Sequence, residues 1–277
     1  MCHVLSVSRS CYYVYRNNGY AVETAAEKKI EAQVVDTFIR HKRRYGVRRL
    51  VPELLEHGLK IGHCKVRRIL HEKGLKAIQP KSFVPRTTDS RHPYPISPNL
   101  LKDKALPVRV NQVWVGDITY IPLKGGGWCF LAVWMDLFSR KVAGWQLLGH
   151  MKETLIIEAF NKAWNNRNAT KGLIVHSDRG GQYAGNVFRK ILNGHKVQQS
   201  MSGADNPYDN AFMESYFSRF KAELLQGGAF EGLENARTAI FEYIETYYNP
   251  ARRHSALGYI SPVAFERQMS CPQKEEV

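Results

Sequence analysis

A short run of apolar and β-branched residues, 113–121, carries one aspartate, Asp117, near its centre. This composition is typical of a buried β-strand. An ionised carboxylate inside such a strand costs free energy unless it is paired or holds a metal ion. The chain must therefore fold so that Asp117 reaches either a partner or a polar cleft.

A second apolar run, residues 172–176, leads into Asp178 and a Gly-Gly turn at 180–181. It also predicts a short strand, with an acid where the strand ends. Two strands that each deliver an acid bring both carboxylates to one edge of a sheet. We therefore expect Asp117 and Asp178 to share a cleft.

A third acid, Glu214, lies in a segment whose apolar residues recur at helical spacing. The repeat defines a core-facing stripe of Met213, Phe217, Phe220 and Leu224. Glu214, Ser218 and Lys221 form the adjacent stripe, since seven residues are about two helical turns. Asp209 or Asn210 suits the helix N-cap.

Three converging carboxylates without a cysteine or histidine cluster favour Mg²⁺ or Mn²⁺ over zinc. Two such ions about 3.5 to 4 Å apart serve in-line displacement at phosphorus. Each acid alone is more often a helix cap, a turn residue or half of an ion pair. The three acids together, on two strands and one helix, favour a metal site.

These residues also carry a family resemblance. Asp117 in WVGDITYI, Asp178 in HSDRGGQY and Glu214 in DNAFMESYFSRFKAEL, with 35 residues between the last two acids and Lys221 seven after Glu214, resemble the DDE signature of integrase-like transposases. Residues 247–266, YYNPARRHSALGYISPVAFE, resemble the tail of the second-frame product (OrfB) of family-three insertion sequences. The family is related to retroviral integrase catalytic cores.

The resemblance implies an RNase H-like core and a DNA transposase or integrase whose three acids bind divalent metal for strand cleavage and strand transfer. Asp117 and Asp178 would share the ions, Glu214 would complete one of them, and Lys221 would hold a DNA phosphate or orient its helix. His176 is either a hydrogen-bonded residue at the sheet edge or a contact to the metal surroundings or DNA. Arg252 and Arg253 follow the last amphipathic helix, and we expect a structural role with some DNA contact.

The formal charge of +15 is concentrated near the N-terminus. Residues 1–99 hold 19 Lys/Arg against 8 Asp/Glu, which indicates a polyanionic partner such as DNA. Apolar periodicity predicts helices over 24–44, 48–56 and 64–72. The last carries Lys65, Arg67, Arg68 and His71 and leads to Lys73, which is compatible with a helix-turn-helix; a small helical bundle with a solvated basic face is the alternative.

The predicted organisation is a basic helical domain over 1–78, a proline-rich linker over 79–107, a mixed α/β catalytic core over 108–268 and a tail over 269–277. In the core we expect strands over 113–121, 128–135 and 142–147, the first two joined by a turn at Gly125–Gly127. Asp136 is a rival acid whose setting suits a strand-end turn better.

The remaining expectations concern the cysteines, the cellular location and the binding partners. Five scattered cysteines favour neither a disulfide framework nor a zinc site, and the spacing of His57, His63, Cys64 and His71 does not fit paired zinc ligands. No apolar run approaches the roughly 18 residues of a membrane span, so we expect a cytoplasmic protein. The resemblance implies a bacterial protein associated with the nucleoid. The resemblance implies element ends and target DNA as partners, a homo-oligomer, and a first-frame product joined near residue 1. Alternatives are a DNA-binding repressor with an inactive core and a nuclease of the same fold.

Overall fold

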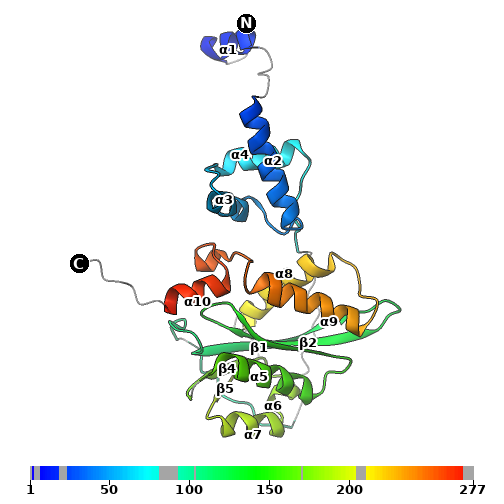
Figure 1. Cartoon of the computed structure of the whole chain (residues 1–277). Helices are drawn as coiled ribbons and strands as arrows, with labels where there is room; N and C mark the ends of the chain where they lie inside the picture. Colours follow the sequence, from blue (N-terminus) through cyan, green and yellow to red (C-terminus); the bar gives the residue numbers. More distant parts are fainter. Residues whose placement is uncertain are drawn as a thin grey trace, which may run out of the picture. The chain divides into compact units, whose positions relative to one another are not determined.

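The computed structural model describes residues 2, 7–18, 24–80, 93–102, 104–169, 171–203 and 210–270. The chain divides into two compact units, Met1–Ala77 and Ile78–Val277 (Figure 1). The expected linker 79–107 falls partly outside the described residues, and most of the predicted tail lies outside them altogether.

The N-terminal unit contains four helices among its described residues: α1 (Arg9–Asn18), α2 (Ala25–Arg40), α3 (Val47–Glu56) and α4 (His63–Glu72). The last three match the predicted helices, whereas α1 was not predicted. Thr24 and Glu27 form a capping box that starts α2. Gly58 and Gly74, both with positive φ, follow the ends of α3 and α4. The helices bury a small core of Val34, Phe38, Leu50, Leu54, Val66, Ile69 and Leu70.

The second unit is built on a five-stranded mixed sheet in the order β3-β2-β1-β4-β5. Its strands are β1 (Val113–Pro122), β2 (Trp128–Asp136), β3 (Val142–Leu148), β4 (Ile174–Ser177) and β5 (Gln198–Met201). The first three pair antiparallel, while β4 runs parallel to both β1 and β5. Gly125 and Gly126 take positive φ in the β1–β2 turn, as their sequence predicts. The predicted mixed α/β class is confirmed.

Helices cover both faces of this sheet (Figure 1). One face packs against α8 (Ala211–Leu225), α9 (Leu233–Phe241) and the π-helical segment Glu242–Tyr248 that continues α9. The other packs against α5 (Glu153–Arg167), α6 (Gly181–Ala184) and α7 (Asn186–Gly194). Val113 and Val115 belong to the α8 side and Trp114 to the α5 side, as alternation along a strand requires. Asp117 therefore lies on the face that carries α8.

Part of the proline-rich segment packs on the core. The Met201 amide donates to Pro98 O at 3.4 Å, the Leu100 amide to Ser200 Oγ at 2.9 Å, and Leu101 packs against the hydrophobic core. The stretch 97–101 thus runs beside β5. This packing differs from the extended linker expected from composition, because composition does not show which sheet edge is available.

Candidate active site

Asp117 lies in β1 and is half-buried. Its Oδ1 accepts a hydrogen bond from the Ile118 amide at 2.7 Å. Burial raises the pKa of Asp117 well above its ordinary value, and the charges of Asp178 and Glu214 raise it further, against the opposing effect of Lys221. The carboxylate thus stands among like charges in poorly hydrated surroundings, which favours a cation beside it.

Asp178 lies just beyond the end of β4, the parallel neighbour of β1. The ladder pairs Val113 with Ile174 and Val115 with His176, a constant offset of 61 residues. If this offset continues for two residues past the last paired position, it brings Asp178 level with Asp117, and neighbouring strands are usually about 4.8 Å apart. The Gly180 amide donates to Asp178 Oδ1 at 3.0 Å and orients the carboxylate toward its turn.

Glu214 and Lys221 come from α8, which packs on the same face of the sheet as Asp117. Met213, Phe217 and Phe220 are buried and Leu224 is half-buried, which confirms the predicted stripe. Glu214 is exposed and Lys221 half-buried along the flank of that stripe. Burial lowers the pKa of Lys221, and the charge of Asp117 opposes this shift. Asn210 occupies the N-cap of α8 without a side-chain capping bond, and Asp209 lies outside the described residues.

The donor set is suited to a hard divalent cation. Asp117 and Asp178 supply carboxylate oxygens at one level of the sheet, and Glu214 lies within electrostatic range of Asp117. Across the described residues, no three His, Cys, Asp or Glu side chains are close enough together to hold a metal ion. Asp178 and Glu214 are both near enough to Asp117 for their charges to raise its pKa, and Glu214 lies on an exposed flank of α8.

Three of the predicted DNA contacts, His176, Arg252 and Arg253, are buried. His176 is fully buried between serines, with Nδ1 2.8 Å from Ser200 Oγ and Nε2 3.3 Å from Ser202 Oγ. Of its two alternatives the structure favours the hydrogen-bonded one. Arg252 is 2% exposed and forms an ion pair with Glu223 at 2.6 Å. The expected DNA contact of Arg252 is wrong, because its guanidinium is enclosed in the protein.

Arg253 is also buried, and its Nη1 donates to the Tyr259 carbonyl at 2.8 Å. Burial leaves little of Arg253 for a DNA contact, and the contacts of both arginines within the protein fit the structural part of their expected role. The local sequence Arg-Arg-His does not reveal this, because the acceptors come from residues that are remote or inside a tight turn.

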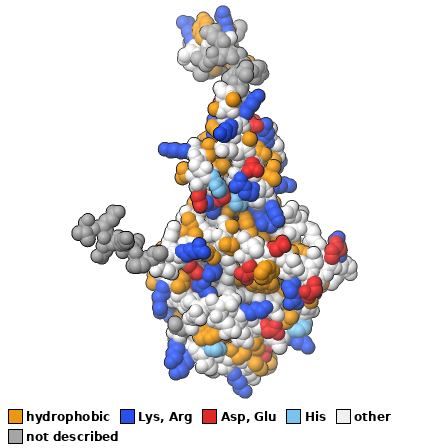
Figure 2. Space-filling model, viewed as in Figure 1, with side chains coloured by type: hydrophobic (Ala, Val, Ile, Leu, Met, Phe, Trp, Pro, Cys, Tyr) orange, Lys and Arg blue, Asp and Glu red, His pale blue; other side chains and the backbone are white. Residues whose placement is uncertain are grey.

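The basic side chains of α4 are largely accessible. Arg67, Arg68 and Lys73 are exposed and Lys65 is half-buried. Lys73 pairs with Glu31, and Arg68 lies 3.7 Å from Glu72. Figure 2 shows Lys and Arg side chains on the visible face interspersed with other types rather than gathered in one patch.

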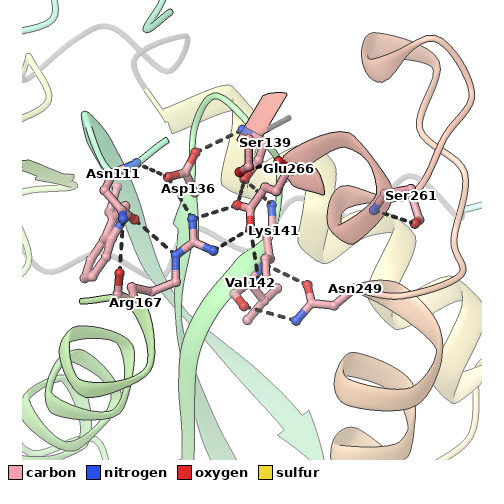
Figure 3. A network of polar contacts seen from close by, with 12 residues as sticks. Asn111, Asp136, Ser139, Lys141, Val142, Arg167, Asn249, Ser261 and Glu266 are labelled. Carbon is pink, nitrogen blue, oxygen red and sulfur yellow. Dashed lines mark hydrogen bonds and ion pairs between the residues drawn. The ribbon is translucent and has the colours of Figure 1, made fainter. Parts of the chain in front are cut away.

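One polar cluster was missed by the sequence analysis (Figure 3). Arg167 donates to both Glu266 oxygens, at 2.7 and 2.6 Å, and reaches Asp136 at 3.4 Å. Asp136 also accepts from the amides of Phe138 and Ser139, which confirms its predicted strand-end turn. The cluster joins β2, α5 and α10 (Pro262–Ser270) and explains Asp136 without catalysis.

Family models match both units of the chain. The integrase core domain matches residues 107–207, a second integrase core domain model matches 195–262, and an HTH-like domain matches 25–83. The intasome structure of simian T-cell lymphotropic virus aligns with a TM-score of 0.50 at 18% identity, covering 82% of this chain and 73% of that chain. Together they define the class as an integrase-type core with a helix-turn-helix-like domain.

Curated relatives narrow the class. Transposase InsF for insertion sequence IS3A of Escherichia coli (strain K12) is 37% identical over 270 residues, 97% of this chain and 93% of the relative. The uncharacterized 31 kDa protein of insertion element IS600 from Shigella sonnei is 37% identical over 268 residues, 97% of this chain and 98% of the relative. The chain belongs to the IS3 family of insertion-sequence transposases, enzymes of the polynucleotidyl transferase type with an integrase catalytic core.

This membership confirms the resemblance seen in the sequence. It does not favour the alternatives of an inactive repressor or a simple nuclease. Among the described residues, no helix has the length and apolar character needed to cross a membrane.

Proposed function

We propose that Asp117, Asp178 and Glu214 hold divalent metal, Mg²⁺ or Mn²⁺, and that the enzyme uses this site to cut DNA at the element ends and join them to target DNA. The observation that carries the proposal is the parallel pairing of β1 with β4 at an offset of 61 residues, which, extended by two residues, would set Asp178 beside Asp117. The raised pKa of Asp117 supports it, because like charges and burial create a demand for a cation there.

Each side chain has a role that follows from its setting. Asp117 and Asp178 would hold ions jointly, each oriented by a backbone amide. Glu214 would complete the coordination from α8. A bound ion supplies positive charge at phosphorus, where negative charge develops. Lys221, on the same helix flank as Glu214, would contact a DNA phosphate as a point charge.

The test is a joining reaction with oligonucleotides that carry the element's terminal repeats, with and without Mg²⁺. Metal-dependent joined products are expected from the wild type, and none from Glu214→Gln. Products that form equally well in excess chelator would overturn the proposal.

We further propose that α4 contacts DNA. Arg67 and Arg68 are exposed on a basic helix of the HTH-like domain. Each phosphate contact contributes a slope of about −0.9 to the dependence of log affinity on log salt. Arg67→Ala/Arg68→Ala in the full chain should flatten the slope by up to about 1.8; an unchanged slope would place the DNA surface elsewhere.

The proposed assembly is a homo-oligomer on element ends and target DNA, joined by the first-frame product of the element. Specific end recognition needs about 10³-fold or more over non-specific affinity, and a single short basic helix is poorly equipped for that. This polypeptide alone should therefore prefer a terminal repeat only weakly over scrambled DNA. Competition binding at fixed salt measures the ratio, and a strong preference would contradict the requirement for a partner.

A further inference from the structure

The helix that carries Glu214 also carries a buried acid. Glu223 of α8 is 3% exposed, and both of its oxygens are engaged. Arg252 Nη2 donates to Oε1 at 2.6 Å and Arg252 Nε to Oε2 at 2.9 Å, while Tyr243 Oη donates to Oε2 at 2.9 Å. These contacts tie α8 to the π-helical segment and to the chain that follows it.

The cluster of Glu223, Arg252 and Tyr243 matters because of where Glu223 lies on α8. Nine residues separate it from Glu214, which is about two and a half turns, so the two acids point to opposite flanks of the helix. Lys221 shares the flank of Glu214, since seven residues are about two turns. The buried apolar stripe lies between the flanks.

Apolar packing alone does not define the rotation of α8 sharply, because hydrophobic contact is non-directional. A two-point contact between a guanidinium and a carboxylate has a defined geometry. Buried ion pairs contribute little net stability compared with apolar residues of similar volume, and their best-attested use is to specify one arrangement. The Glu223–Arg252 pair is placed to hold one rotation of α8.

We propose that Glu223 and Arg252, assisted by Tyr243, are positioning residues for strand transfer: they set the rotation of α8 that directs Glu214 and Lys221 toward Asp117. This inference rests on the proposed metal role of Glu214. Burial alone would lower the pKa of Arg252, but Tyr243 and Glu223 outweigh it and hold that pKa well above its ordinary value. Arg252 therefore stays charged throughout the working pH range.

The test replaces the whole pair, because removal of one partner leaves an uncompensated buried charge that threatens folding. The double variant Glu223→Met/Arg252→Met keeps side chains of similar volume and removes the ion pair whose geometry defines the rotation of α8. At saturating DNA the double variant should join strands at least tenfold more slowly, and the Mg²⁺ concentration for half-maximal joining should rise at least threefold. DNA affinity should stay unchanged.

A matched control is Arg167→Met/Glu266→Met, which removes a largely buried ion pair between α5 and α10 that does not include α8. It should lower the thermal midpoint and leave the Mg²⁺ dependence unchanged. Wild-type Mg²⁺ dependence in the Glu223/Arg252 double variant, or an equal shift in the control, would overturn the proposal.

Two milder variants decide the question if the double variant does not fold. Tyr243→Phe removes one hydrogen bond to Glu223, and Arg252→Lys keeps the charge but loses the two-point geometry. Both should shift the Mg²⁺ midpoint upward by less than the double variant would, and normal midpoints in both would refute the inference. Full joining activity in Glu214→Gln would instead refute the proposed function, so the two failures are distinguishable.

Discussion

Asp117 and Asp136 lie on the neighbouring strands β1 and β2, which pair with each other, yet their surroundings differ sharply. Asp136 is fully buried and accepts bonds from the Asn111 amide at 2.6 Å and from the Phe138 and Ser139 amides at 2.9 Å, with Arg167 at 3.4 Å. Asp117 is surrounded instead by the charges of Asp178 and Glu214.

The contrast extends to the groups around each aspartate. Although burial raises the pKa of Glu266, hydrogen bonds from Arg167 and Ser139 outweigh it and hold that pKa below its ordinary value. The pKa of Asp117 moves in the opposite direction. A compensated acid stabilises the fold, whereas an acid among like charges marks a place built for a cation.

The largest expected effect is on catalysis. Asp117→Asn, Asp178→Asn or Glu214→Gln should each reduce strand transfer by about 10³-fold or more, because each removes charge that holds cations at phosphorus. DNA binding, measured by fluorescence anisotropy, should survive. Near-normal joining by a folded variant would show that the substituted acid is not part of the metal site. It would also weaken the contrast drawn between Asp117 and Asp136.

The next effect is on stability. Arg167→Ala should lower the free energy of unfolding by about 3–5 kcal/mol, because it leaves Asp136 buried without its cation and leaves Glu266 with Lys141 alone. Denaturant unfolding measures the change. The matched control is Glu231→Ala, which removes an exposed pair with Lys124 and should cost less than about 1 kcal/mol. Equal losses in the two variants would show that the Asp136 cluster is not structural.

Lys221→Ala should slow joining by roughly tenfold, the equivalent of one lost charged contact worth about 1.4 kcal/mol. Its thermal midpoint should change little, since burial already disfavours the charge of Lys221. A large fall in the midpoint would show instead that Lys221 compensates Asp117 in the way that Arg167 compensates Asp136.

The smallest effect is a gain. Because the pKa of Asp117 is raised in the folded protein, its contribution to stability is fully present below the ordinary value of 3.8 and is lost as the pH rises toward the raised pKa. Asp117→Asn should therefore have a larger free energy of unfolding than the wild type at pH 7 in chelator, as measured by denaturant unfolding. The gain should shrink at pH 4; a gain of equal size at both pH values would have another origin.

Local patterns predicted much of the fold and of the candidate site. Alternation and β-branching indicated β1 to β3, and helical spacing indicated α2, α3, α4 and α8. The three acids stood out by their spacing and by the apolar runs that carry Asp117 or lead to Asp178. The partners of buried charges were not predictable in this way. Glu223 lies 29 residues from Arg252, and Arg167 lies 99 residues from Glu266.

Such pairs depend on which helices and strands pack against each other, and the periodicity of the local sequence does not predict that packing. Arg252 and Arg253 looked like DNA contacts for the same reason. Helix α1 was not recognised in the N-terminal segment, and α6 is a single turn, too short to show helical spacing. The residues of α10 were interpreted as part of a family motif and not as a helix.

The parallel pairing of β1 with β4 also has a consequence for how the enzyme acquires activity. The two aspartates are 61 residues apart, and the intervening chain must first fold as a hairpin, a third strand and α5. Pairings between distant strands form slowly, because loop closure costs entropy before any contact repays it. A nascent chain that has completed only β1 to β3 possesses Asp117 but no catalytic pair, so cutting competence should arrive late in folding.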